Sequence, residues 1–151
     1  MLSLYSGLSA VSSSLFACSR VVVPYLRDRG VAYRDDLECY ERRHERREQW
    51  YRAIRDYNRD DKSRLAASIF GEHDIYVGIR DREEYLASRG LAIVSFWIDS
   101  GRRVSYRDPT CGVTRDMCDV VVDNNGTIGD LERQAKRFGL ACRTLRFPGR
   151  G

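Results

Sequence analysis

The feature that most restricts the fold is the apolar stretch at residues 91–98, which ends at Asp99. These eight residues are too few to span a bilayer, which takes about 20 apolar residues. A strand with one face in water alternates apolar and polar residues, whereas this stretch is apolar almost throughout. We therefore expect a strand of a parallel sheet that is covered on both faces.

Other short apolar segments alternate with segments of helical periodicity. The expected strands are residues 2–5, 75–77, 91–98 and 119–122, and the expected helices are residues 15–30, 38–58, a short helix carrying Leu65 and Ile69, and residues 82–89 and 128–138. Pro24 is expected to kink the first helix and Gly30 to end it. Strands that alternate with helices predict an α/β fold with a mainly parallel sheet. The 151 residues show no internal repeat and are expected to form one domain, residues 1–151.

The helix expected at residues 38–58 lies in a highly charged segment, residues 36–58. Glu38 with Arg42 and Glu48 with Arg52 are spaced to form i,i+4 ion pairs on a solvated face. The apolar residues that share the opposite face are Trp50, Ile54 and Tyr57. We expect that face to dock on the body of the protein.

The charge balance excludes some classes of protein. Of the 26 basic residues all but Lys62 and Lys136 are arginine, and they face 22 acidic residues, for a net charge of +4. A hydrophobic fraction of 42% is enough for a core, which argues against a disordered chain. The small positive excess permits phosphorylated ligands, but it does not indicate a dedicated nucleic-acid binder. It leaves a nucleic-acid partner and a homodimer open.

Cysteine usage and the N-terminal residues bear on location. The five cysteines include no C-x-x-C pair, so they give neither a zinc template nor a regular disulfide framework. Reduced thiols fit a cytosol. The first 19 residues are apolar or small, but no Lys or Arg precedes Arg20, and a signal peptide needs a positive n-region. We therefore expect a cytoplasmic protein without a membrane partner.

Residues 7–14 resemble half of a phosphate loop. In the pattern G-x-x-x-x-G-K-[S/T], Gly7 and Ser14 match, while Ser12 and Ser13 replace the second glycine and the lysine. Backbone N–H groups at a helix start attract phosphate, and the Ser14 hydroxyl is a candidate Mg²⁺ ligand. The alternative is a Gly/Ser turn that only caps a helix, and these eight residues alone favour it.

Charged residues that follow the expected strands form a second group of candidates. Arg80 comes after the strand at residues 75–77, at the edge where open α/β sheets bind ligands, and suits a phosphate. Alternatively, it starts the next helix and pairs with Glu83 or Glu84. Asp99 follows the most apolar strand, where a carboxylate can hold a metal ion or its water, although a solvated aspartate is the simpler interpretation.

The segment at residues 100–117 is rich in arginine and broken by Gly and Pro. Its arginines are Arg102, Arg103, Arg107 and Arg115. A mobile loop of this kind can close over a nucleotide and neutralise a transferring phosphoryl group. The alternative is a solvated charged loop.

The remaining polar motif, residues 123–127, joins a strand to the last helix. Asn and Gly readily form turns and Thr127 is expected to cap the helix, so a structural role is preferred here. His44 and His73 are isolated and offer no spacing for a metal site or a catalytic triad.

Several of these segments together resemble a known family. The segments are "YNRDDKSRLAASI", "HDIYVGIRDREEY", "WIDSGRR" and "CDVVVDNNGTIGDLE". Across roughly residues 38–138 the chain resembles phage deoxynucleoside monophosphate kinases and related P-loop nucleotide kinases. The resemblance implies a P-loop kinase-like three-layer α/β sandwich with a phosphate loop at residues 7–14, a substrate arginine at Arg80 and an arginine-rich lid at about residues 100–117. It also implies ATP, Mg²⁺ and a nucleoside monophosphate as ligands, and it puts Ser13 where the family carries a lysine.

We therefore expect a phosphotransferase that moves the γ-phosphoryl group of ATP to a deoxynucleoside monophosphate or to a nucleotide in DNA. In this hypothesis Gly7, Ser12, Ser13 and Ser14 bind ATP, Ser14 and Asp99 serve Mg²⁺, and Arg80, Arg102 and Arg103 are catalytic. One alternative is a catalytically impaired nucleotide-binding or regulatory protein of phage origin, acting in the host cytoplasm. Another is an interaction protein that uses the charged helix.

Overall fold

The computed structural model describes residues 7–104 and 110–144, with only the backbone for residues 142–144. The strand expected at residues 2–5 and the lid residue Arg107 lie outside this part of the chain. Short strands are separated by helices along it, and the longest helical stretch lies between the first two strands. Their order is β1 (Ala10–Ser12), α2 (Ser13–Ala17), the π-helix η1 (Cys18–Val22), α3 (Val23–Arg27), α4 (Asp36–Glu41), the 3₁₀-helix η2 (Arg42–Arg46), α5 (Arg47–Tyr57), α6 (Arg64–Glu72), β2 (Ile75–Val77), α7 (Arg82–Ser88), η3 (Arg89–Leu91), β3 (Phe96–Asp99), η4 (Arg115–Met117), β4 (Val120–Asp123) and α8 (Ile128–Thr144).

The described strands form two parallel pairs. β1 pairs with β2, with Ala10 opposite Ile75, and β3 pairs with β4, with Phe96 opposite Val120. The α/β class and the parallel order are thus confirmed. The sequence predicts one sheet, whereas the described residues form two two-stranded sheets.

β3 is shorter and more exposed than its composition predicts. Residues 92–95 are not strand, because Ser95 is bound at the strand entrance by the Asp119 carboxylate, which accepts from Ser95 N at 2.8 Å and from Ser95 Oγ at 2.6 Å. Ile93 and Ile98 are 54% and 52% exposed, so the prediction of a strand covered on both faces is wrong. In β2, Val77 is also half exposed, although the sequence predicts a buried strand.

β1 lies inside the serine-rich segment that the sequence predicts as a loop. The Asp74 carboxylate accepts hydrogen bonds from Ser9 N and Ser9 Oγ, each at 2.9 Å, and so aligns the chain before the first strand pair. Val11 then stands opposite Tyr76 in the parallel register. The prediction of a loop across residues 7–14 is therefore wrong for Ala10–Ser12. These residues are extended and paired with β2, so they do not form a loop around a phosphate.

The first helical segment contains a π-turn next to its proline. Val23 N donates to Cys18 O, five residues back, directly before Pro24. Pro24 has no N–H to donate, so a change of hydrogen-bond pattern at this point costs little. The segment ends at Arg27, and Gly30 has a φ of +76°, a conformation that favours glycine and turns the chain out of the helix.

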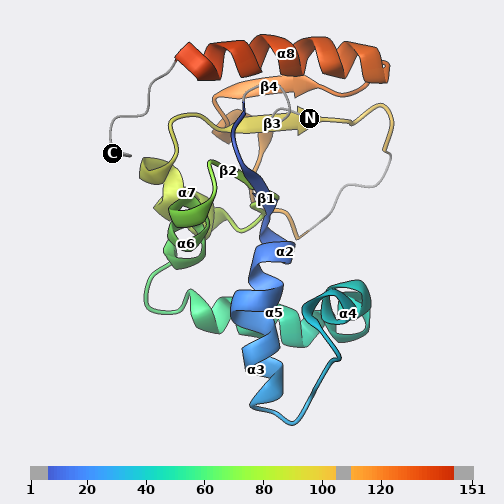
Figure 1. The fold of residues 1–151 in the computed structure, drawn as a ribbon. Helices are drawn as coiled ribbons and strands as arrows, with labels where there is room; N and C mark the ends of the chain where they lie inside the picture. Colours follow the sequence, from blue (N-terminus) through green and yellow to red (C-terminus); the bar gives the residue numbers. More distant parts are fainter. Residues whose placement is uncertain (1–6, 105–109, 145–151) are drawn as a thin grey trace.

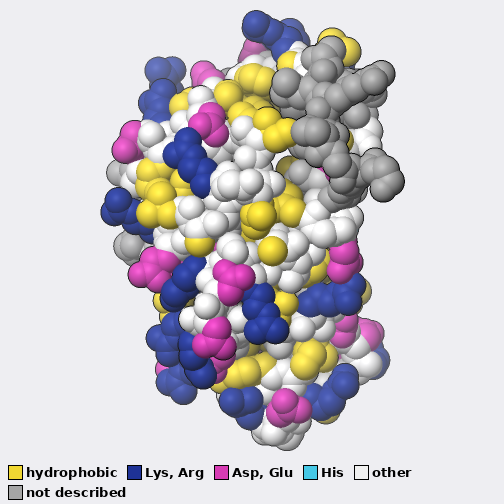
Figure 2. Space-filling view, turned by 90° about the vertical axis from the view of Figure 1, so that its left-hand side faces the viewer, with side chains coloured by type: hydrophobic (Ala, Val, Ile, Leu, Met, Phe, Trp, Pro, Cys, Tyr) yellow, Lys and Arg dark blue, Asp and Glu magenta, His cyan; other side chains and the backbone are white. Residues whose placement is uncertain are grey.

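The charged segment is helical but not one continuous helix. α4 and α5 run in different directions, with η2 between them (Figure 1). The predicted ion pairs Glu38–Arg42 and Glu48–Arg52 are both present. Both pairs lie at the surface, with Glu38 the least exposed of the four side chains at 28%, so each pair contributes only about 0.3–0.5 kcal/mol. On the face in Figure 2, basic and acidic side chains are interspersed rather than gathered by sign.

The main core lies among α2, α3, α4, α5 and α6, in the lower half of Figure 1. Leu65 and Ile69 are fully buried there, as predicted. The other large side chains with almost no exposure are Val22, Leu26, Cys18 and Cys39. A second packed region lies where α8 covers β3 and β4, with the rings of Phe96 and Phe138 5.3 Å apart.

No helix in the described part of the chain is both long enough and apolar enough to cross a membrane.

Candidate functional site

Two aspartates meet at the carboxyl ends of β3 and β4. Asp99 and Asp123 are opposite each other in the parallel register. Asn125 holds this edge together, because its side-chain amide donates to Asp99 O at 3.1 Å and to Asp123 Oδ1 at 2.8 Å. The result is a pair of carboxylates at the edge of a parallel strand pair, where α/β proteins bind ligands.

Arginines surround this pair. A guanidinium nitrogen of Arg115, on η4, lies 3.8 Å from Asp99 Oδ2. Arg102 N donates to Asn125 Oδ1 at 2.7 Å, and Arg102 lines the same pocket as Asp123. Hydrogen bonds from Asn125, aided by the charge of Arg102, hold the pKa of Asp123 below its usual value. The edge therefore keeps an ionised carboxylate next to cationic groups.

These residues line an open pocket of about 480 Å³. This volume falls within the range of about 300–1,000 Å³ that is usual for small-molecule sites. Its lining residues are Asp99, Gly101, Arg102, Arg115, Val121, Asp123, Asn125 and Gln134. The lining is mainly polar, which suits a phosphorylated ligand better than an apolar one.

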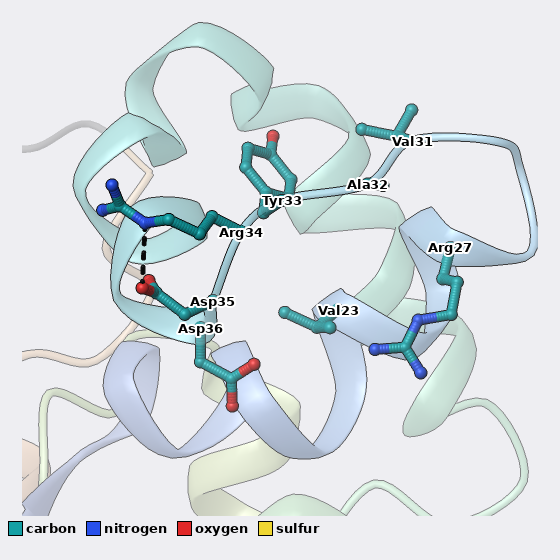
Figure 3. Close-up of a pocket in the computed structure, with 8 residues that line it drawn as sticks. All are labelled: Val23, Arg27, Val31, Ala32, Tyr33, Arg34, Asp35 and Asp36. Carbon is teal, nitrogen blue, oxygen red and sulfur yellow. Dashed lines mark hydrogen bonds and ion pairs between the residues drawn. The ribbon is translucent and has the colours of Figure 1, made fainter.

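A second pocket, of about 150 Å³, lies between α3 and α4 (Figure 3). It includes the Arg34–Asp35 ion pair, with Arg34 Nε 3.2 Å from Asp35 Oδ2. None of the predicted site residues line it. We therefore take the β3–β4 pocket as the candidate site.

The segment that precedes β4 connects the pocket to the loop after β2. Gly112 N donates to Arg80 O at 2.9 Å, and a Cβ at Gly112 would come within 3.1 Å of Arg82. Three residues later Arg115 meets Asp99. The structure therefore brings the Arg80 loop into contact with the described part of the predicted lid, residues 100–104 and 110–117.

Arg103 belongs to the same lid. Its backbone N–H donates to Ser100 O at 2.9 Å, so the lid begins with a tight turn. Its guanidinium donates to Asn124 O at 3.4 Å. Arg102 and Arg103 are thus both anchored to the turn that follows β4.

The predicted ATP-binding serines lie at the junction of β1 and α2. Ser12 caps α2, because its hydroxyl accepts from Leu15 N at 3.2 Å. Ser13 Oγ donates to Gly78 O at 3.3 Å, next to the Arg80 loop. Ser14 is half-buried in the first turn of α2, and exposed Gly7 precedes β1. The helix start therefore carries its own serine cap, as the turn interpretation predicts.

A buried carboxyl group lies directly behind this junction. Tyr76 Oη donates to Glu84 Oε1 at 2.7 Å, and Glu84 is only 6% exposed. Burial raises the pKa of Glu84, the Asp81 carboxylate adds to the rise, and the Tyr76 hydrogen bond opposes it. Burial also raises the pKa of Tyr76. The sequence interpretation weighed Glu84 only as a partner for Arg80, and a contact across eight residues between a strand and a helix has no local signature.

Sequence analysis also missed Asn125 and Gln134 as site residues. Gln134 reaches from α8 to the end of β4, where its side chain bonds both Asp123 N, at 3.1 Å, and Asp123 O, at 2.7 Å. The predicted turn and cap at residues 123–127 are present, with Asp130 N donating to Thr127 Oγ1 at 3.2 Å. The only signal for a role in the site was that this turn follows a parallel strand.

The donor set fits Mg²⁺ bound together with a phosphate. Mg²⁺ usually takes one or two protein carboxylates and fills its shell with water and phosphate oxygens. Asp99 and Asp123 supply two carboxylates, and no group of three His, Cys, Asp or Glu side chains arranged for a metal occurs in the described residues. Asp123 is thus the neighbour of Asp99 in this structure, while Ser14 lies in α2, after the other strand pair, and its metal role stays a prediction.

Gly78 is expected to resist substitution. Its φ is +95°, and an added Cβ would lie 3.3 Å from Ser13 Oγ. Gly78→Ala should therefore lower the free energy of unfolding by about 1–2 kcal/mol, the cost of a left-handed residue with a side chain. Chemical denaturation measures this. Gly71→Ala is the control, because Gly71 lies in α6 with open space around it and alanine there should stabilise by up to about 1 kcal/mol. Equal effects at the two positions would contradict the strain at Gly78.

Glu84 should make the free energy of unfolding decrease as pH rises. Exposed aspartates with a lowered pKa, such as Asp123, have the opposite effect. Because its pKa is raised in the folded state, its contribution is present below the pKa of an unfolded glutamate and is lost as pH rises through the folded pKa. Glu84→Gln cannot ionise, so the stability of this variant relative to the wild type should increase as pH rises. Urea unfolding across a pH series tests this, and a stability difference that does not change with pH would refute it.

Comparisons with protein-family models, with curated proteins and with solved structures found no match to this chain.

Proposed function

We propose that the protein is a nucleotide-kinase-like phosphotransferase. It transfers the γ-phosphoryl group of ATP to a deoxynucleoside monophosphate or to a nucleotide in DNA. The proposal includes a P-loop kinase-like fold, which the parallel strand order and the resemblance at residues 38–138 support. Its ligands are ATP, Mg²⁺ and the acceptor nucleotide.

One observation carries this proposal. Asp99 and Asp123 lie side by side at the carboxyl ends of two parallel strands, with Arg102 and Arg115 lining the same open pocket. Phosphoryl transfer is catalysed mainly by positioning and by charge, and it needs carboxylates for the metal and cations for the phosphate oxygens. This edge supplies both kinds of group.

The predicted arginines and metal ligands each have a role in this proposal. Arg102 and Arg103 neutralise charge on the transferring group, and Arg80 binds the acceptor phosphate. Asp99, joined by Asp123, holds Mg²⁺ or its water shell, with the Ser14 hydroxyl as the further predicted ligand. When bound, Mg²⁺ bridges and neutralises phosphate oxygens.

The junction of β1 and α2 favours a second candidate, a protein that binds a nucleotide without transferring phosphate. Ser12 already caps Leu15 N, and Ser13 brings no cation to the phosphates. The loss of one preorganised donor costs about 10²–10³-fold in rate for other enzymes. Such a protein would act as a regulator of phage origin in the host cytoplasm.

One experiment separates the candidates. A coupled assay follows transfer from ATP with Mg²⁺ to each of the four deoxynucleoside monophosphates, for the wild type and for Ser13→Lys, and calorimetry measures ATP binding by both. The kinase proposal predicts turnover that increases in Ser13→Lys. Binding without turnover in either protein supports the second candidate, and the absence of both refutes both.

A further inference from the structure

The two aspartates at the edge of the β3–β4 pocket each have one carboxylate oxygen held by N–H groups. Asp123 Oδ1 accepts hydrogen bonds from Asn125 N at 2.9 Å and from Asn125 Nδ2 at 2.8 Å. Asp99 Oδ1 accepts from Gly101 N at 3.0 Å. These bonds orient both carboxylates. Within the described residues, the other oxygen, Oδ2, accepts a hydrogen bond in neither of them.

At Asp99 this second oxygen faces a cation that belongs to the protein itself. The Arg115 guanidinium lies 3.8 Å from Asp99 Oδ2, too far for a hydrogen bond but close enough for the charges to attract each other. The Arg115 side chain is 63% exposed and makes no other ion pair among the described residues. Its backbone is fixed separately, because Cys118 N donates to Arg115 O at 3.2 Å. The guanidinium can therefore leave Asp99 without a change in the fold.

Arg115 and a metal ion compete for the same oxygen. Mg²⁺ binds carboxylate oxygens, and a positive charge that faces the same oxygen repels it. A phosphate changes this balance, because a guanidinium binds phosphate oxygens through paired, charge-assisted hydrogen bonds that the 3.8 Å contact with Asp99 lacks. Both residues line the open pocket of about 480 Å³, so an anion that enters it meets Arg115 beside Asp99.

We propose that Arg115 exchanges Asp99 for a phosphate oxygen, and that this exchange couples the binding of the anion to the binding of the metal ion. Without an anion, Arg115 faces Asp99 Oδ2 and weakens metal binding. With an anion, Arg115 turns to the oxygens of the anion and leaves Asp99 Oδ2 to the metal ion. Because such coupling is reciprocal, the metal ion raises the affinity for the anion by the same factor. The choice of Mg²⁺ and a phosphorylated ligand rests on the proposed function.

The first test measures metal binding without a nucleotide. Mn²⁺ takes the same oxygen ligands as Mg²⁺, and EPR spectroscopy measures the free ion during a titration of the full-length protein. Arg115→Ala should bind Mn²⁺ about threefold more tightly than the wild type, the scale of a surface ion pair, and Arg115→Gln should do the same. Thermal unfolding checks that each variant is folded.

Arg102→Ala is the matched control for this test. It removes the same charge from the same pocket, but Arg102 forms no ion pair with Asp99 in the described part of the chain. A general effect of charge would raise the Mn²⁺ affinity equally in both variants. The exchange predicts a smaller increase in Arg102→Ala than in Arg115→Ala.

The second test adds sulfate, a tetrahedral oxyanion that stands in for phosphate. At constant ionic strength, sulfate should raise the Mn²⁺ affinity of the wild type about threefold, because it draws Arg115 away from Asp99. In Arg115→Ala the sulfate effect should be largely lost, since that variant has no guanidinium to exchange.

The outcomes separate the exchange from the proposed function. If ATP and Mg²⁺ support phosphoryl transfer but Arg115→Ala binds Mn²⁺ like the wild type, the exchange is refuted and the proposed function stands. If calorimetry shows no ATP binding but Arg115→Ala tightens Mn²⁺ binding and loses the sulfate effect, the exchange is supported and the proposed function is refuted. An equal gain in Arg102→Ala and Arg115→Ala, or no Mn²⁺ binding by the wild type with sulfate present, would overturn the exchange.

Discussion

Leu26→Ala is expected to lower the free energy of unfolding by about 3 kcal/mol. Leu26 has no exposed surface and packs in the core formed by α2–α3, α4, α5 and α6. Truncation of a buried leucine loses transfer free energy and leaves a cavity, at a cost of about 2–5 kcal/mol. Its backbone carbonyl also accepts hydrogen bonds from Arg29 N and Val31 N, and these survive the substitution. The measured loss therefore reports side-chain packing.

Leu86→Ala is the matched control. Leu86 lies on α7 and is 52% exposed, so its truncation should cost less than about 1 kcal/mol. Urea denaturation of the wild type and both variants gives the comparison. Similar losses for Leu26 and Leu86 would show that the core is not where this structure puts it.

Arg102→Ala is expected to have the largest effect on function. Arg102 lines the β3–β4 pocket and its charge lowers the pKa of Asp123. Removal of a preorganised charged donor should reduce the kcat/KM of phosphoryl transfer by about 10²–10³-fold. The hydrogen bond to Asn125 comes from the Arg102 backbone and remains in the variant, so the turn should stay folded.

The control for this change is Arg133→Ala. Arg133 is an exposed arginine on α8 that pairs with Asp130 in the same helix, outside the pocket. Its loss should leave transfer within about twofold of the wild type, because a surface pair contributes little. If both arginine variants lose activity equally, net charge rather than the pocket controls the reaction.

Local patterns predicted the helices well. The spacing of Leu65 and Ile69 placed both in the core, and Thr127 caps the last helix as its position predicts. These features depend on residues within one or two turns, so a single sequence contains the information. The helix ends were predicted less well, since α8 continues through Gly139 to Thr144 although the sequence predicts an end at about residue 138.

Strand positions depended on partners that the sequence does not reveal. Ala10–Ser12 is a strand because it meets Ile75–Val77, and serine-rich composition alone predicts a loop there. Likewise, residues 91–98 read as one long buried strand, although only the last part pairs with β4. Pairing between distant residues decides both cases.

The candidate site was partly predictable for a geometric reason. Side chains at the ends of parallel strands share one edge, which brings Asp99 together with the arginines of the segment that follows. The Tyr76–Glu84 contact and the role of Gln134 could not be predicted, because each joins a strand to a helix at a spacing with no periodic signature.

The central claim is that the aspartates and arginines of the β3–β4 pocket hold the Mg²⁺ and the transferring phosphate of bound ATP, and calorimetric titration of ATP with Mg²⁺ tests it most directly. The wild type should show saturable binding at one site, and Arg102→Ala combined with Arg115→Ala should bind about 10²-fold more weakly, while Arg133→Ala matches the wild type. No binding by the wild type, or equal binding by all three proteins, would contradict the assignment of this pocket.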